Sequence, residues 1–361
     1  MRLYKTFYFL AALCVLAALV LLITGNKELT APAIILFFIT LSIAFQGSRS
    51  LKGFSYTMVV LASVSAALFY PALFRKWGNF DLAVLIVPLI QLIMFGMGTS
   101  MSFRDFIGVV RSPKGVIIGV VSHFLIMPLL GFLLAYLSGL PPEIAAGIVL
   151  IGCSPNGMAS NVIAYLARAN VALSVTITAI STSLAPFLTP LLMKLLAGQF
   201  IEIDAWHMMM EIMKMVIAPI AAGLLFNHFF TGKFKWLDKT MPYVSMFGVA
   251  FSIVVIAAAG RDNLLSIGPV LLLIVLVHNL TGYLLGYWSA RLFKMNEKDC
   301  RTVAIEVGMQ NGGLATGIAK SLGKLATLGL APAVFGPLMN VTGSILASWW
   351  HKKTPKDEIE S

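Results

Sequence analysis

Apolar runs about as long as a bilayer is thick recur along almost the whole chain. Roughly 20 apolar residues in a helix cross a hydrocarbon core of ~30 Å, because each residue adds about 1.5 Å. Breaks at charged, Gly and Pro residues give twelve candidate spans, near residues 6–24, 31–47, 55–74, 82–102, 115–138, 144–167, 171–197, 207–230, 241–260, 265–290, 302–322 and 330–350. We therefore predict an all-α polytopic membrane protein.

Composition narrows the class of protein. Only 11% of the residues are charged and 59% are apolar, whereas soluble domains have about 25% and 45–50%. These values exclude a soluble enzyme and argue against a nucleic-acid binder. The continuous apolar runs exclude an outer-membrane barrel, because the strands of such a barrel alternate apolar and polar residues. The three cysteines, Cys14, Cys153 and Cys300, have no close spacing and form no disulfide framework or zinc ligand set, so no cofactor is expected.

The positive charges indicate the orientation. If the twelve spans alternate, 18 of the 26 Lys and Arg residues fall on the side that holds both termini, and 6 fall opposite. Cytoplasmic loops carry the excess of Lys and Arg, so we expect both termini to be cytoplasmic in an inner (plasma) membrane. The first run starts with Arg2 and Lys5, like a signal peptide, but no small-residue cleavage site precedes Lys27, which favours a retained helix.

A short internal repeat links two distant segments. Residues 152–162 align with residues 308–318 at a shift of 156, with identical pairs Gly152/Gly308, Gly157/Gly313 and Ala159/Ala315. The segments lie five spans apart, and an odd number of spans inverts the second copy relative to the first. Inverted repeats with interrupted helices are typical of secondary transporters, whose binding sites lie where the breaks meet.

Both repeated segments contain residues that interrupt a helix. Pro155 lacks a backbone N–H and clashes with the preceding turn, and Gly152 and Gly157 weaken the helix around it. Gly308 and Gly312 do the same in the second segment. The alternative is a pair of kinked packing helices with small residues at their contacts. The polar residues beside the breaks favour the interrupted form.

Polar side chains gather around the two breaks. Glu306 lies in an apolar run beside the second break, where a carboxylate is costly unless something cationic or protic satisfies it. Ser160 and Asn161 follow the first break, and Ser174 and Thr178 share one face of the next helix. These oxygens fit a hard monovalent cation. The alternatives are a carboxyl that bonds a neighbouring helix and hydroxyls that bond their own backbone.

Several motifs in order resemble one family. They are residues 152–163 (GCSPNGMASNVI), 170–175 (NVALSV) and 306–311 (EVGMQN), with 95–98 (FGMG) and 278–287 (HNLTGYLLGY). They resemble the bile acid:sodium symporter family, and in particular its bacterial members, over about residues 54–350.

The resemblance implies a fold of ten helices in two inverted five-helix repeats with crossed broken helices, plus an N-terminal two-helix extension. The implied divisions are the extension 1–53, the symporter unit 54–350 with repeats 54–197 and 205–350, panel helices about 55–102 and 207–260, core helices about 115–197 and 265–350, and a cytoplasmic tail 351–361.

The resemblance also implies sodium-driven uptake of an organic anion, bile acid-like or another carboxylate, by alternating access, with Na⁺ as the coupling ion. The first implied sodium site consists of Ser160, Asn161, Ser174, Thr178 and Glu306. The second consists of Glu306, Val307, Met309 and Gln310 together with His123, which stands where the family has glutamine. The expected substrate cavity includes Met158, Ala159, Asn311, Gly313 and Asn340.

Other mechanisms remain open at this point. His123 titrates near neutral pH, so proton coupling through His123 and Glu306 is the main alternative, although a lone buried His is more often a satisfied helix contact. An intramembrane enzyme is a remote alternative, since no HExxH or GxSxG motif is present. A channel is disfavoured because broken helices suit a gated site. The motifs specify neither the anion nor the oligomeric state.

Overall fold

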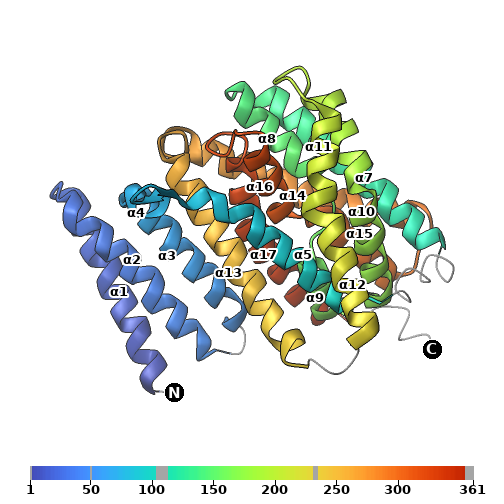
Figure 1. Cartoon of the computed structure of the whole chain (residues 1–361). Helices are drawn as coiled ribbons and strands as arrows, with labels where there is room; N and C mark the ends of the chain where they lie inside the picture. The colour runs from blue at the N-terminus through green and yellow to red at the C-terminus, as the bar shows by residue number, and fades with distance from the viewer. Residues whose placement is uncertain (1, 49–50, 103–112, 231–234, 354–361) are drawn as a thin grey trace.

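The computed structural model describes residues 2–48, 51–102, 113–230 and 235–353, and almost all of them are helical (Figure 1). A two-stranded antiparallel hairpin, β1 (Lys76–Trp77) and β2 (Phe80–Asp81), is the sheet found in these residues. The helices are α1 (Arg2–Ile23), α2 (Lys27–Gln46), α3 (Ser55–Phe69), α4 (Pro71–Arg75), α5 (Ile86–Ser100), α7 (Pro113–Ser138), α8 (Pro142–Cys153), α9 (Ala159–Leu166), α10 (Val171–Leu192), α11 (Ala205–Ile212), α12 (Ala218–Phe230), α13 (Lys235–Ala259), α14 (Arg261–Leu292), α15 (Glu297–Gly308), α16 (Gly312–Ser321) and α17 (Leu330–His351).

The structure confirms an all-α polytopic membrane protein. In the described residues, eight helical segments are long and apolar enough to cross a bilayer, and three more apolar helices are shorter. The sequence predicted twelve spans. The segment 144–167 is divided into α8 and α9, and the segment 302–322 into α15 and α16. Each piece is too short to cross alone, and both divisions fall in the two segments that the sequence predicts to be interrupted. Short π-helical stretches, η3 (Met193–Ala197) and η4 (Met213–Ile217), extend α10 and join α11 to α12.

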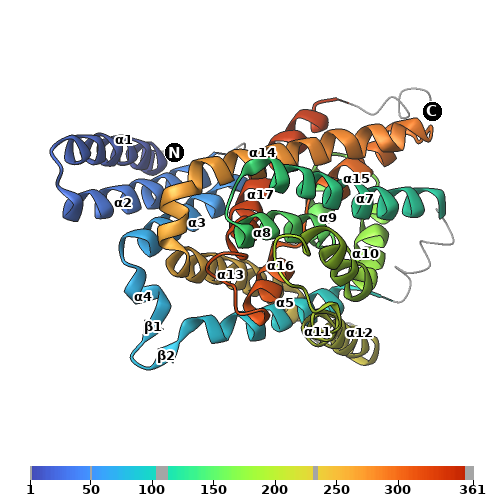
Figure 2. The same ribbon diagram turned by 90° about the horizontal axis from the view of Figure 1, so that it is seen from above.

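The first two helices form a hairpin at one edge of the molecule, beside α3 (Figures 1 and 2). Asn26 caps the N-terminus of α2, where its side-chain oxygen accepts a hydrogen bond from the amide of Leu29. A pair of buried serines connects α2 to α3: the Ser42 hydroxyl lies 2.9 Å from that of Ser55, and each contacts the other's carbonyl. The outward face of α1 exposes large apolar side chains such as Leu16, as expected for a helix that faces lipid.

Polar contacts join helix ends at the two faces of the bundle. At one face, Arg301 in the first turns of α15 donates to the carbonyls of Ala167, Trp350 and Lys353, at the ends of α9 and α17. At the other face, Glu143 in the first turn of α8 accepts hydrogen bonds from Lys324 and Thr327, which precede α17. These contacts agree with spans that alternate in direction.

The Glu143 contact predicts a pH-dependent contribution to stability. The hydrogen bonds from Lys324 and Thr327 hold the pKa of Glu143 below its usual 4.5. Because this pKa is lower in the folded state than in the unfolded state, the ionised carboxylate stabilises the folded protein at pH values above 4.5. This stabilisation is lost as the pH falls through the lower, folded-state pKa. Glu143→Gln is therefore expected to lower thermal stability at pH 7 by no more than about 1 kcal/mol, because the pair is partly exposed. The difference should vanish in strong acid, as thermal unfolding at several pH values would measure; a gap that widens in acid would contradict the assignment.

Candidate functional site

Two interrupted helices meet at their breaks. The gap between α8 and α9 covers residues 154–158, and the gap between α15 and α16 covers residues 309–311. Asn156 and Gln310 form an antiparallel backbone bridge, and the amide of Asn311 donates to the carbonyl of Pro155 at 2.7 Å. Extended backbone from one gap therefore satisfies polar groups in the other, as irregular backbone at membrane depth requires.

The break residues expected from the sequence lie in or beside these gaps. Pro155 and Gly157 are within the first gap, Gly152 is in the last turn of α8, and Gly308 and Gly312 border the second. A Cβ on Gly152 would stand 2.5 Å from the carbonyl oxygen of Met127, and one on Gly308 would overlap the ring of Tyr283. These glycines thus permit close helix packing as well as interrupting the helices.

Glu306 lies at the crossing and is fully buried. One carboxylate oxygen accepts from the Ser174 hydroxyl at 2.5 Å, and the other from the Thr178 hydroxyl at 2.9 Å. The Asn161 side-chain oxygen lies 2.8 Å from the Ser174 hydroxyl and 3.4 Å from that of Thr178. Ser160 reaches the same group, with its hydroxyl 3.4 Å from that of Thr178. The five residues come from α9, α10 and α15.

This cluster presents oxygen atoms from a carboxylate, an amide and three hydroxyls. The Ser160 hydroxyl donates to the carbonyl of Gly157 at 2.8 Å. The hydroxyls of Ser174 and Thr178 lie within hydrogen-bond distance of both oxygens of Glu306 and of the Asn161 side-chain oxygen. Among the described residues, none forms an ion pair with Glu306. A buried carboxylate without a counter-charge is costly, so this arrangement suits a small cation bound by oxygen ligands.

His123, on α7, is fully buried behind this cluster. Its Nδ1 lies 3.1 Å from the carbonyl oxygen of Glu306, and its Nε2 lies 2.9 Å from that of Ser154. The Asn156 side-chain amide contacts both His123 Nδ1, at 3.2 Å, and the Glu306 carbonyl. A neutral ring that donates from Nε2–H to Ser154 accepts at Nδ1 from the Asn156 amide, and that amide also donates to the Glu306 carbonyl. His123 therefore connects the backbone of both broken helices.

The predicted second site is partly saturated by the protein itself. The carbonyl of Val307 already accepts from the Gln310 side-chain amide at 2.9 Å, and Met309 lies buried beside it. Two buried oxygens, Asn156 Oδ1 and Gln310 Oε1, have no hydrogen-bond partner in the part of the chain that the structure describes. The sequence argument missed Asn156 as a member of this group. The sequence signal that could have found it is a polar side chain directly after Pro155, at the break of an apolar segment.

A cavity of about 420 Å³ lies against the crossing. The five residues predicted for a substrate cavity line this one: Met158, Ala159, Asn311, Gly313 and Asn340. The opposite wall comes from α5 and α13, through methionines and serines that the sequence argument did not single out: Met94, Met97, Ser100, Met241, Ser245 and Met246. None of its described lining residues is Lys, Arg or His. The cavity therefore has an apolar, Met-rich wall facing a polar wall of backbone and amide groups.

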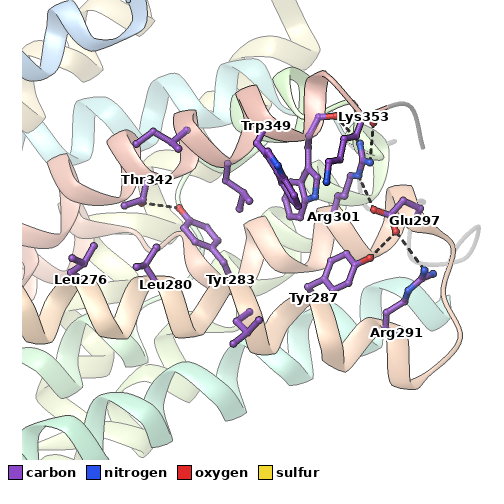
Figure 3. A pocket seen from close by; sticks show the side chains of 14 residues that line it. Leu276, Leu280, Tyr283, Tyr287, Arg291, Glu297, Arg301, Thr342, Trp349 and Lys353 are labelled. Carbon is purple, nitrogen blue, oxygen red and sulfur yellow. Dashed lines mark hydrogen bonds and ion pairs between the residues drawn. The ribbon is translucent and has the colours of Figure 1, made fainter. Parts of the chain in front are cut away.

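A larger recess, about 950 Å³, lies apart from this site, between α14 and α17 (Figure 3). It contains none of the residues of the crossing. We call it the α14–α17 groove; its walls include Leu276, Leu280, Leu284, Ile345, Trp349 and Lys353.

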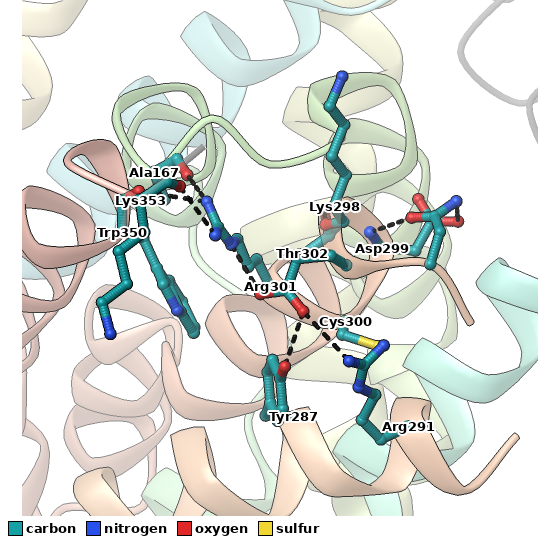
Figure 4. A network of polar contacts seen from close by, with 12 residues as sticks. Ala167, Tyr287, Arg291, Lys298, Asp299, Cys300, Arg301, Thr302, Trp350 and Lys353 are labelled. Atoms are coloured by element: carbon teal, nitrogen blue, oxygen red, sulfur yellow. Dashed lines mark hydrogen bonds and ion pairs between the residues drawn. The ribbon is translucent and has the colours of Figure 1, made fainter. Parts of the chain in front are cut away.

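A polar network fixes the helix that carries Glu306 (Figure 4). Arg301 is nearly fully buried, its side chain 3% exposed, and its Nε lies 3.0 Å from Glu297. The guanidinium also donates to three carbonyls at the ends of α9 and α17 and lies over the ring of Trp350, at 5.7 Å. One turn of α15 is thereby anchored to the two helices that flank the crossing.

Comparison with known proteins agrees with these observations. Residues 87–267 match the model of the sodium bile acid symporter family. The chain is 40% identical over 293 residues to an uncharacterized sodium-dependent transporter, YocS, of Bacillus subtilis (strain 168), covering 81% of this chain and 89% of that protein. It is 35% identical over 263 residues to BASS1 of Arabidopsis thaliana, a probable chloroplastic sodium/metabolite cotransporter, covering 73% and 66%. These relatives are named as transporters and cotransporters, not as enzymes.

A multi-pass helical bundle with crossed breaks, a buried carboxylate among hydroxyl and amide oxygens, and extended identity to sodium-dependent transporters all point the same way. The chain belongs to the sodium bile acid symporter family.

Proposed function

We propose that this protein couples the inward movement of sodium to the uptake of an organic anion by alternating access. The observation that carries the proposal is the buried carboxylate of Glu306, surrounded by hydroxyl and amide oxygens and without an ion-pair partner among the described residues, at the contact of the two broken helices. Such a site gains most from a cation at the point where the two helices must be held together.

In this proposal sodium binds between Glu306, Ser160, Asn161, Ser174 and Thr178. The ion supplies the positive charge that the carboxylate lacks and allows the two hydroxyl protons to turn away from it. The second ion site would use Asn156 Oδ1 and Gln310 Oε1, the oxygens without partners. His123 would then hold the carbonyl of Ser154 directly and that of Glu306 through the Asn156 amide.

The anion would bind in the 420 Å³ cavity. The first residues of α9 and α16, including Ala159 and Gly313, line it, and helix N-termini attract anions through their free amides. The methionines opposite offer an apolar surface. We therefore propose a carboxylate or sulfonate with an apolar body, bile acid-like or smaller.

The inverted repeats, 54–197 and 205–350, and their panel and core helices are part of the same proposal. The proposal also includes cytoplasmic termini and a plasma-membrane location, for which the distribution of Lys and Arg is the support. In alternating access, the core helices, which contain the crossing, would move relative to the panel helices, which include α5 and α13 of the opposite cavity wall.

A gradient experiment tests the coupling ion. In liposomes that contain the purified protein, an inward sodium gradient is expected to drive accumulation of a labelled anion chosen from bile acids and small carboxylates. A pH gradient in sodium-free buffer should give only background uptake. Uptake driven by the pH gradient alone would favour proton coupling through His123 and Glu306 and overturn sodium coupling.

A further inference from the structure

We propose that an anionic phospholipid of the surrounding membrane binds in the α14–α17 groove. Its phosphate would lie at Lys353, and one acyl chain would follow the apolar part of the groove. The proposal concerns a surface apart from the crossing, and its test uses neither sodium nor transport.

The apolar part of the groove has the length of one membrane leaflet. Leu276, Leu280 and Leu284 line it along α14, and Ile345 lines it along α17 (Figure 3). From Leu276 to Tyr287 the helix rises about 16 Å, roughly half of a ~30 Å hydrocarbon core. Leu280, Leu284 and Ile345 are all exposed in the isolated chain. This surface therefore suits an acyl chain.

The other end of the groove is cationic. Arg291, Arg301 and Lys353 line it together with a single carboxylate, Glu297. That carboxylate is already engaged: it lies 3.0 Å from Arg301 and 3.7 Å from Arg291, and it accepts from the Tyr287 hydroxyl at 2.7 Å. The cationic end therefore has an excess of positive charge.

Lys353 and Arg291 are the cations within reach of a ligand. Lys353 is exposed, and within the described residues its ammonium group has no carboxylate partner. It lies 3.9 Å from the centre of the Trp349 ring, while its backbone carbonyl is held by Arg301. The Arg291 side chain is 40% exposed. An exposed lysine beside the Trp349 ring, at one end of an apolar groove, matches a phosphate attached to an acyl chain, and the half-exposed Arg291 adds positive charge to the same end.

Position within the bundle favours a lipid over a soluble anion. The cationic end is bordered by Trp349, Trp350 and Tyr287, and such rings concentrate where hydrocarbon meets headgroups. Seen from above, α14 runs along the periphery of the bundle (Figure 2). Basic pockets between membrane helices are known headgroup sites.

Native mass spectrometry of the full chain in a mild detergent tests the proposal. With added phosphatidylglycerol we expect one lipid to remain bound, and with phosphatidylcholine none at the same concentration. Lys353→Gln is expected to weaken the phosphatidylglycerol complex about fivefold. Lys352→Gln is the matched control, because it removes the same charge from the adjacent exposed residue, which does not line the groove.

Ile345→Trp, which fills the apolar part, should also weaken retention without a change of charge. Equal retention of both lipids would overturn the proposal, as would equal effects of Lys352→Gln and Lys353→Gln, which would indicate diffuse surface attraction. Displacement of the lipid by inorganic phosphate would also overturn the proposal. So would a dimer of the protein that persists when lipid is added.

Discussion

Glu306→Gln is expected to abolish the stabilisation of the folded protein by sodium. A ligand that binds only the folded state stabilises it by about 2.7 kcal/mol at a hundredfold excess over its Kd. Gln has nearly the shape of Glu but no charge, so Ser174 and Thr178 keep a hydrogen-bond partner while the ion loses its counter-charge. Thermal unfolding in NaCl against KCl measures the effect, and sodium-driven uptake should fall to background.

The stability of this variant in KCl separates ion binding from simple damage. Because the wild-type carboxylate is buried without a cationic partner, the variant is expected to be at least as stable as wild type without sodium. Glu211→Gln is the control, because it removes a carboxylate that pairs with Lys214 at 3.1 Å and takes no part in the proposed sodium site. A sodium-specific shift that persists in Glu306→Gln would refute the proposed site.

Arg301→Met is expected to destabilise the protein by about 3–5 kcal/mol, the usual cost of removing one partner from a buried ion pair. The change leaves Glu297 without its closest cation and the carbonyls of Ala167, Trp350 and Lys353 without their donor. Arg301→Lys should recover only part of this loss, because an ammonium group cannot match the planar guanidinium. Thermal unfolding in detergent measures both variants.

Arg291→Gln is the matched control for this prediction. Arg291 also contacts Glu297, but at 3.7 Å and with a side chain that is 40% exposed. Exposed pairs contribute about 0–1 kcal/mol, so this variant should remain close to wild type. Equal losses from the two arginines would show that burial of Arg301 does not set its contribution.

The proposed mechanism makes the ion and the anion mutually dependent. Asn156 and Asn311 belong to the gaps that the two broken helices share, and Asn311 also lines the cavity. An ion that stabilises this crossing would therefore pre-form one wall of the anion site. By linkage, each ligand should then tighten the binding of the other by the same factor.

Much of the fold could be predicted because its signals are local. Apolar runs and helix-breaking residues such as Pro155 act within one or two turns, so the sequence determined the helical membrane class and the places where helices stop. The cluster around Glu306 was also accessible, because Ser174 and Thr178 are one turn apart and a carboxylate inside an apolar run requires a partner.

Only the tertiary structure decided which groups from distant helices meet. Three features depend on how helices pack across the bundle: the contacts of His123 with Glu306 and Ser154, the Asn156 oxygen that has no partner among the described residues, and the anchoring of α15 by Arg301. The wall that Met94 and Met241 add to the cavity likewise joins residues almost 150 positions apart. In a chain this apolar, nearly every helix face can pack against another, so hydrophobic patterning cannot select the partners. Close glycine contacts and buried hydrogen bonds select them, and both exist only once the helices are assembled.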